Sequence, residues 1–124
     1  MENKMNKLVK KSFNAPDETR FIAKGKVEVV KLDDSQVILN KFEPGWRWSE
    51  SVKPIAKTDS CQVNHTLYIV SGRLSVRMND NSTAEFGPGD VGVIPAGHDA
   101  WVNGDVACVN LDFGGSTTYA KPMS

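Results

Sequence analysis

The stretch Gly87–Asn103, GPGDVGVIPAGHDAWVN, indicates two turns, a short apolar strand and the start of another strand. Pro88 fixes φ for a turn, and the glycines on either side of it tolerate positive φ. The chain is therefore expected to reverse before an extended run over Val91–Ile94. A second turn, Pro-Ala-Gly, then brings His98 and Asp99 to the beginning of the next strand. This pattern indicates a β-fold with polar side chains near one end of a strand.

Two motifs in the chain resemble those of the cupin superfamily. A glycine followed after five residues by Pro-x-Gly, here Gly89, Pro95 and Gly97, is similar to the second cupin motif. The earlier stretch Cys61–Gly72 is similar to the first motif, which ends in a tyrosine-containing apolar run and a glycine turn. When the neighbouring motifs of this sequence are included, the resemblance spans residues 42–115. Together these motifs resemble those of small bacterial single-domain cupins. It implies an all-β fold, the double-stranded β-helix or jelly-roll barrel.

The metal-binding positions of these motifs are degenerate in this sequence. In the first motif, the two histidine positions fall on Asp59 and Cys61, and the glutamate position falls on His65. In the second motif, the histidine position falls on Ala100, whereas the histidine that is present is His98. The resemblance therefore implies the fold without carrying over a complete set of metal ligands.

Short alternating runs separated by turns favour the same fold class. Alternation begins at Lys26, a hairpin turn is indicated at 33–35, and the run Arg73–Met78 alternates again. Pro16–Arg20 predicts a single helical turn, and Ser51–Ser60 predicts a loop. We expect an N-terminal arm over 1–25, a barrel over 26–115 and a C-terminal tail over 116–124.

Composition limits the classes of partner. A chain of 124 residues with 40% hydrophobic content suits one domain. Its 15 basic and 15 acidic residues balance, so the chain has no net positive charge that would attract nucleic acid or an anionic membrane. A small-molecule ligand is therefore the expected partner. No run is long enough to cross a bilayer, and two cysteines without a secretory signal predict a cytoplasmic protein. Exposed edge strands predict a homodimer.

His65 is the first candidate for a pocket. On a regular strand, alternate residues from Cys61 to Ile69 share one face, which the cupin register turns toward the barrel interior. His65 would then face the cavity, or it would be a packed histidine bonded to a backbone carbonyl. The same geometry separates Cys61 from His65 by about 13 Å and predicts no direct hydrogen bond. Cys61 is then expected either to pack in the buried core or to serve as a metal ligand.

Two histidines near one cavity suggest a divalent metal such as zinc, iron, nickel or manganese. A stable site needs a third ligand, which would be Cys61, Asp59 or Asp99 beside His65 and His98. Alternatively, His98 hydrogen-bonds its own loop and Asp99 caps a turn. The missing motif histidines favour a barrel without a metal.

Two neighbouring residues complete the candidates. Trp48 would form an aromatic wall for a ligand or fill the barrel, and Arg47 would recognise a carboxylate at the mouth. By alternation Trp101 lies outside the cavity.

Three hypotheses of function follow, and none assigns a catalytic residue. The favoured one is a binding module that holds a small organic ligand in the barrel, without a metal. The second is a metal-dependent enzyme, an oxygenase or a lyase, with an unusual His/Cys/Asp ligand set. The third is a non-catalytic barrel for dimerisation or sensing. Fold alone does not choose among them.

Overall fold

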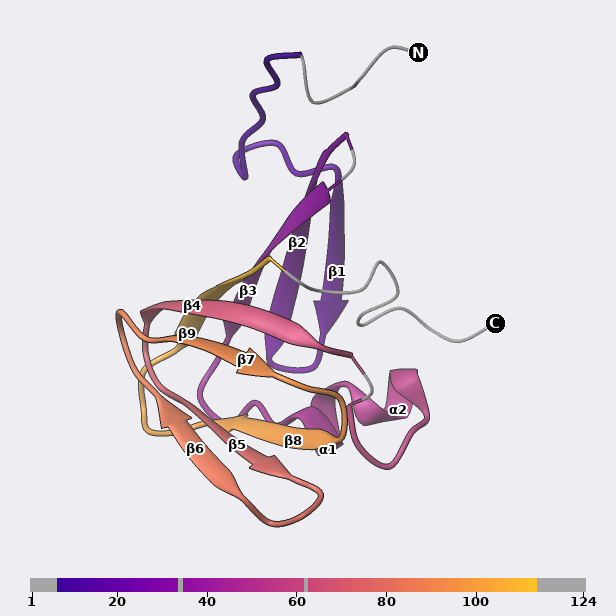
Figure 1. Ribbon diagram of the computed structural model, residues 1–124. Helices are drawn as coiled ribbons and strands as arrows, with labels where there is room; N and C mark the ends of the chain where they lie inside the picture. Colours follow the sequence, from indigo (N-terminus) through magenta and orange to yellow (C-terminus); the bar gives the residue numbers. More distant parts are fainter. Residues whose placement is uncertain (1–6, 34, 62, 114–124) are drawn as a thin grey trace.

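The computed structural model, which describes residues 7–33, 35–61 and 63–113, contains two antiparallel β-sheets (Figure 1). The strands are Glu18–Ile22 (β1), Gly25–Leu32 (β2), Ser35–Phe42 (β3), His65–Ser71 (β4), Leu74–Met78 (β5), Thr83–Phe86 (β6), Val91–Ile94 (β7), His98–Val102 (β8) and Cys108–Asp112 (β9), and the helices are Trp48–Ser51 (α1) and Lys53–Ala56 (α2). The larger sheet has the order β1-β2-β3-β9-β4-β7, and the smaller has the order β6-β5-β8. The predicted all-β jelly-roll class is confirmed.

The stretch Gly87–Asn103 forms the predicted turns and strands. Gly89 and Gly97 both have positive φ, at 90° and 94°, and they flank strand β7. Strand β8 then begins at His98 and pairs with β5, where Met78 lies opposite His98. The hairpin between β2 and β3 is confirmed as well, with Val29 opposite Ile38.

Two expectations about local structure were wrong. The predicted helical turn at Pro16–Arg20 is replaced by strand β1, because backbone pairing with β2 outweighs the weak local helix signal. The larger sheet therefore begins within the segment 1–25 that was expected to be an arm. The predicted loop over Ser51–Ser60 contains α2 and the end of α1, which bury Val52 and Trp48 against the core. The predicted tail over 116–124 lies outside the described residues.

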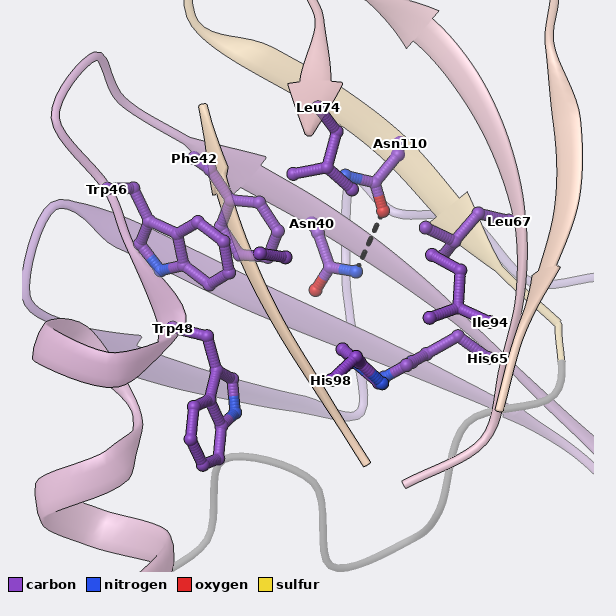
Figure 2. Close-up of a pocket in the computed structure, with 11 residues that line it drawn as sticks. Asn40, Phe42, Trp46, Trp48, His65, Leu67, Leu74, Ile94, His98 and Asn110 are labelled. Atoms are coloured by element: carbon purple, nitrogen blue, oxygen red, sulfur yellow. Dashed lines mark hydrogen bonds between the residues drawn. The ribbon is translucent and has the colours of Figure 1, made fainter. Parts of the chain in front are cut away.

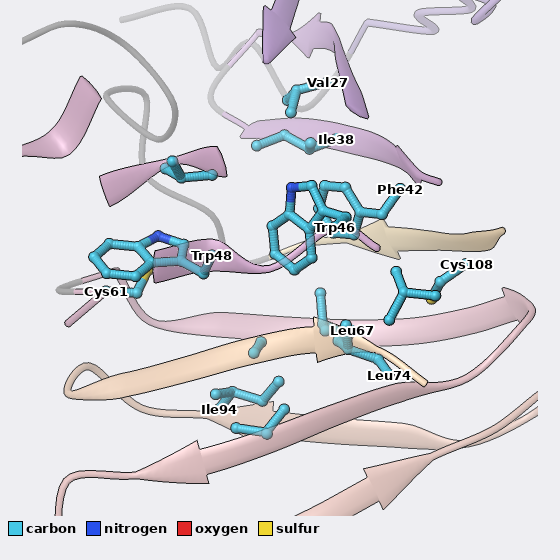
Figure 3. Close-up of a cluster of buried hydrophobic side chains, with 14 of the residues drawn as sticks. Val27, Ile38, Phe42, Trp46, Trp48, Cys61, Leu67, Leu74, Ile94 and Cys108 are labelled. Atoms are coloured by element: carbon cyan, nitrogen blue, oxygen red, sulfur yellow. The ribbon is translucent and has the colours of Figure 1, made fainter. Parts of the chain in front are cut away.

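The hydrophobic core lies between the two sheets and combines many aliphatic side chains with the rings of Phe42, Trp46 and Trp48 (Figure 3). The indole of Trp46 stacks on the ring of Phe42, with 3.8 Å between centroids and 7° between planes. Trp48 is also buried, at the start of α1. These large side chains occupy much of the barrel interior and leave little room for a ligand there.

None of the helices in the described ranges is long and apolar enough to cross a membrane.

Candidate metal centre

The fold brings Cys61, His65 and His98 together, and all three are buried. His65 and His98 are the first residues of β4 and β8, and their rings meet edge to face with centroids 5.2 Å apart. A backbone bridge holds Cys61 beside β8, because the Cys61 N–H donates to the His98 carbonyl over 2.8 Å. One ligand atom from each of the three residues lies within 4.8 Å of the others. This spacing suits a single metal ion.

The predicted separation of Cys61 from His65 was wrong. The Cys61 Sγ lies 3.5 Å from the His65 Nε2, within hydrogen-bonding distance. The regular strand that was expected over Cys61–Ile69 starts only at His65, so the spacing of a continuous strand does not apply between Cys61 and His65. From His65 onward the expected inward face is observed, with Leu67 and Ile69 buried.

Both imidazoles are oriented by an acceptor on their Nδ1 atoms. The His98 Nδ1 donates to the Pro95 carbonyl oxygen over 2.7 Å, and the His65 Nδ1 donates to the Asp112 Oδ2 over 2.5 Å. A carbonyl and a carboxylate can only accept here, so each Nδ1 carries a hydrogen. The two Nε2 atoms are then the coordinating atoms. Metal-bound histidines typically show this pattern, with the second nitrogen bonded to a carboxylate or a backbone carbonyl.

The buried thiol and imidazole perturb each other strongly. Burial by itself raises the pKa of Cys61, but hydrogen bonds to His65 and His98 and their charges outweigh it and lower the pKa from 9.0 to about 6. Burial by itself lowers the pKa of His65, whereas hydrogen bonds and charge from Asp112 and Cys61 raise it from 6.5 to about 9. Cys61 is therefore a thiolate at neutral pH, which is the form that binds metals.

We expect the metal-free protein to show a thiolate by ultraviolet absorbance at neutral pH, and the signal to fall as the pH drops through about 6. Cys108 is the internal reference, because burial raises its pKa and keeps it protonated. Asp112→Asn should move the Cys61 midpoint upward, because His65 is then less readily protonated. A thiolate signal that appears only near pH 9 in the native protein would contradict this assignment.

A small cavity borders the two histidines (Figure 2). Figure 2 shows Phe42, Trp46 and Trp48 on one side of it and His65 and His98 on the other. The space open to a water molecule is about 20 Å³, enough for one or two waters. Pockets for organic ligands usually span about 300–1,000 Å³. The cavity beside the two histidines is therefore too small for the small organic ligand of the favoured hypothesis.

Arg47 and Asp99 lie away from this cavity. They line an outer recess of about 420 Å³ together with Ser60, Arg77 and Asn79, among others. The Arg47 Nε donates to the Asp99 Oδ2 over 3.3 Å, and the guanidinium lies 4.4 Å from the centre of the Trp101 ring.

Asp99 also accepts from the backbone N–H of Ser49 over 3.1 Å, which links β8 to α1 rather than capping the turn before Asp99. Trp101 is half-buried, while its neighbours Ala100 and Val102 face the core, as alternation predicted. Of the proposed third ligands, Asp59 is fully exposed and approaches Lys53, so the structure gathers Cys61 alone with the two histidines.

Sequence reasoning missed Asp112 and the asparagine pair on the cavity wall. Asn40 on β3 donates to the Asn110 Oδ1 on β9 over 2.9 Å, and both side chains are buried. The signal was in the alternation of Cys108–Asp112, where residues 108, 110 and 112 share the inward face. A carboxylate on such a face needs a hydrogen-bond donor or a cation as partner, which His65 provides.

The sequence profile of a family described as the EutQ-like cupin domain matches residues 51–112. The chain belongs to this family. The match includes the three residues of the candidate centre as well as Asp112. No curated protein matches the sequence of this cupin.

Solved structures share the cupin fold at low sequence identity. The polyketide cyclase RemF from Streptomyces resistomycificus is 14% identical with a TM-score of 0.63, covering 88% of this cupin and 80% of that chain. An oxalate decarboxylase from Lactobacillus farciminis is 22% identical with a TM-score of 0.56, covering 86% of this cupin and 31% of that chain. A protein of unknown function from Acinetobacter sp. ADP1 is 15% identical with a TM-score of 0.53, covering 73% of this cupin and 80% of that chain. These similarities establish the fold. The chemistry of this cupin has to be inferred from the residues of its own site.

Proposed function

We propose that this cupin binds one divalent transition metal through Cys61 Sγ, His65 Nε2 and His98 Nε2. The observation that carries the proposal is the clustering of three buried ligand atoms, with both histidines oriented through Nδ1. Thiolate and imidazole suit zinc, iron and nickel, whereas manganese prefers oxygen ligands. Three protein ligands are typical of metal sites that keep a fourth position for water or a substrate. Bound there, the metal would act as a Lewis acid.

The chain's own residues prepare the site for a metal. Asp112 holds the His65 ring and accepts its Nδ1 hydrogen, and the Pro95 carbonyl does the same for His98. The Nε2 proton that His65 shares with the thiolate is the one that a metal would displace. Metal binding is therefore expected to release protons.

A metal-free thiolate nucleophile is the competing interpretation of the same atoms. Cys61, His65 and Asp112 form the connected thiol, base and carboxylate of a nucleophilic triad. Reactive cysteines, however, are partly exposed to their substrates, whereas Cys61 is 1% exposed and the adjacent cavity holds only a water or two. The burial favours a metal ligand over a nucleophile.

The test is elemental analysis of protein purified without added metal, followed by titration of the metal-free protein with Co²⁺. We expect about one metal per chain and a thiolate-to-cobalt charge-transfer band. Cys61→Ser should lose the band, while Cys108→Ser, at the other buried cysteine, should keep it. Protein that takes up neither native metal nor Co²⁺ would refute the proposal.

A thiolate ligand must remain reduced, which supports the proposal of a cytoplasmic location. Both cysteines in the structure are free.

We also propose a homodimer that covers the exposed apolar side chains near the β7 edge. Val91 and Val93 on β7 are 68% and 72% exposed, and Val70 on the neighbouring strand β4 is also exposed. An apolar edge strand favours pairing with another copy. Light scattering should report a dimer at micromolar concentration, and Val93→Glu should shift it toward monomer. Thr19→Glu, on β1 at the opposite edge of the same sheet, is the control. A monomeric native protein at high micromolar concentration would exclude this interface.

A further inference from the structure

Unpartnered polar atoms are concentrated around the cavity that borders His65 and His98. In the described part of the chain, four buried side-chain polar atoms have no hydrogen-bond partner: Glu28 Oε1, Asn40 Oδ1, Trp46 Nε1 and Trp48 Nε1. The last three belong to residues that line this cavity, and each of these side chains is more than nine-tenths buried. Figure 2 shows the indole nitrogen of Trp48 on the ring edge that faces the two histidines. The residues of the cavity wall therefore carry two donors and an acceptor without partners, and the Trp48 donor faces the histidines.

Such atoms are costly to leave unpaired. A buried donor or acceptor without a partner has lost its hydrogen bonds to water and gained none in the protein, which destabilises the fold. A wall of phenylalanines would fill the same region with no such penalty, yet the tryptophans and the asparagine that line this cavity leave two indole N–H groups and an amide oxygen unpaired. Buried polar groups in native proteins are paired with protein, water or a ligand. The wall is thus built for a polar occupant.

Size limits what that occupant can be. The cavity's 20 Å³ of water-accessible space corresponds to one or two water-sized groups. The stacked Trp46 and Phe42 rings and the buried Trp48 close the aromatic side of the cavity. A linear anion of three heavy atoms is about as long as two waters in contact, so an occupant with four or more heavy atoms would require these rings to move.

We propose that the cavity selects a polar ligand of at most about three heavy atoms, held by the Trp48 indole N–H and completing the coordination of the metal. This inference rests on the proposed metal centre, because His65 and His98 border both the cavity and the ligand cluster. The indole donors favour an acceptor such as a small anion. The Asn40 Oδ1 accepts from a protonated ligand atom or from a water beside it. Trp48 is then a specificity-determining residue of this site.

The experiment uses the Co²⁺-loaded full chain and follows its absorption spectrum. Azide, an anion of three heavy atoms, should perturb the spectrum, whereas imidazole and benzoate should leave it unchanged. Trp48→Phe should weaken azide binding about tenfold, as expected for the loss of one hydrogen bond to a charged ligand. If azide binding depended only on the volume of the cavity, Trp48→Phe would leave it unchanged or strengthen it, because the phenyl ring is smaller than the indole. Trp101→Phe, outside the cavity, is the matched control and should leave azide binding unchanged.

The outcomes separate the inference from the metal centre on which it rests. Failure to take up Co²⁺ overturns both. Uptake of Co²⁺ with no response to azide, or with imidazole bound as tightly as azide, overturns the inference alone. Unchanged azide affinity in Trp48→Phe likewise overturns the role of Trp48. The native chain by itself decides the size limit, so this part of the test holds even if the variant does not fold.

Discussion

His65→Asn is expected to lower the affinity of this cupin for zinc by more than about 100-fold while the chain remains folded. The asparagine Nδ2 stands where the histidine Nδ1 stood, so it continues to donate to Asp112. Nothing replaces the Nε2 atom that faces Cys61. Competition with a chromophoric chelator measures the affinity, and thermal unfolding of the metal-free protein measures the stability.

Companion variants separate loss of a ligand from loss of a packed side chain. His65→Ala removes the same Nε2 and also the imidazole partner of Asp112, whose side chain is fully buried. Breaking a buried pair in this way costs about 3–5 kcal/mol. His98→Ala should also lose zinc, and Tyr68→Phe, on the outward face of β4, should not. Wild-type zinc affinity in His65→Asn, or a large drop in melting temperature with unchanged metal content in His65→Ala, would defeat the assignment.

Gly72→Ala is expected to destabilise the metal-free protein by roughly 3 kcal/mol or more. Gly72 lies between β4 and β5 with φ at +77°, a conformation that disfavours any side chain. An added Cβ would also meet the Ala107 carbonyl oxygen and the Cys108 Cα, at 2.6 Å from the latter. Backbone atoms cannot turn aside as a side-chain end can. The start of β9, the strand that carries Asp112, would have to move.

Gly89→Ala is the matched control for this prediction. Gly89 has a similar φ, +90°, but an added Cβ would meet no atom within 4 Å. The strain of positive φ alone should cost about 1–2 kcal/mol. Denaturant unfolding of the two variants beside the native chain therefore isolates the steric contribution at Gly72. Equal losses of stability in both variants would show that the contact with Ala107 and Cys108 does not constrain the fold.

The turns and most of the strands follow from local features of the sequence. The turn before Val91, the turn before His98 and the hairpin near Asp33 depend on residues that restrict or permit particular φ values. Alternation then decides which side chains face inward, as it did for Leu67 and Ile69. Register counted from the glycine turn placed His65 on the interior side.

Local reasoning failed where distant pairing outweighed it. Strand β1 exists because β2 provides backbone partners for it, and no short-range pattern in Pro16–Arg20 contains that information. The sequence also predicts an extended strand from Cys61 to His65, because no nearby residue signals that strand pairing begins only at His65. The backbone bridge from Cys61 to His98 decides where the thiol lies.

The sequence by itself determined the fold class, the inward position of His65 and the approach of His98 to the same cavity, because turn residues and two-residue alternation act over short distances. Only the tertiary structure decided that Cys61 reaches the His65 Nε2, that Asp112 holds the other side of the ring, and that aromatic rings leave room for a water or two. Those contacts join residues of different strands and segments. Their geometry depends on strand register and side-chain packing across the whole barrel, which one-dimensional spacing does not encode.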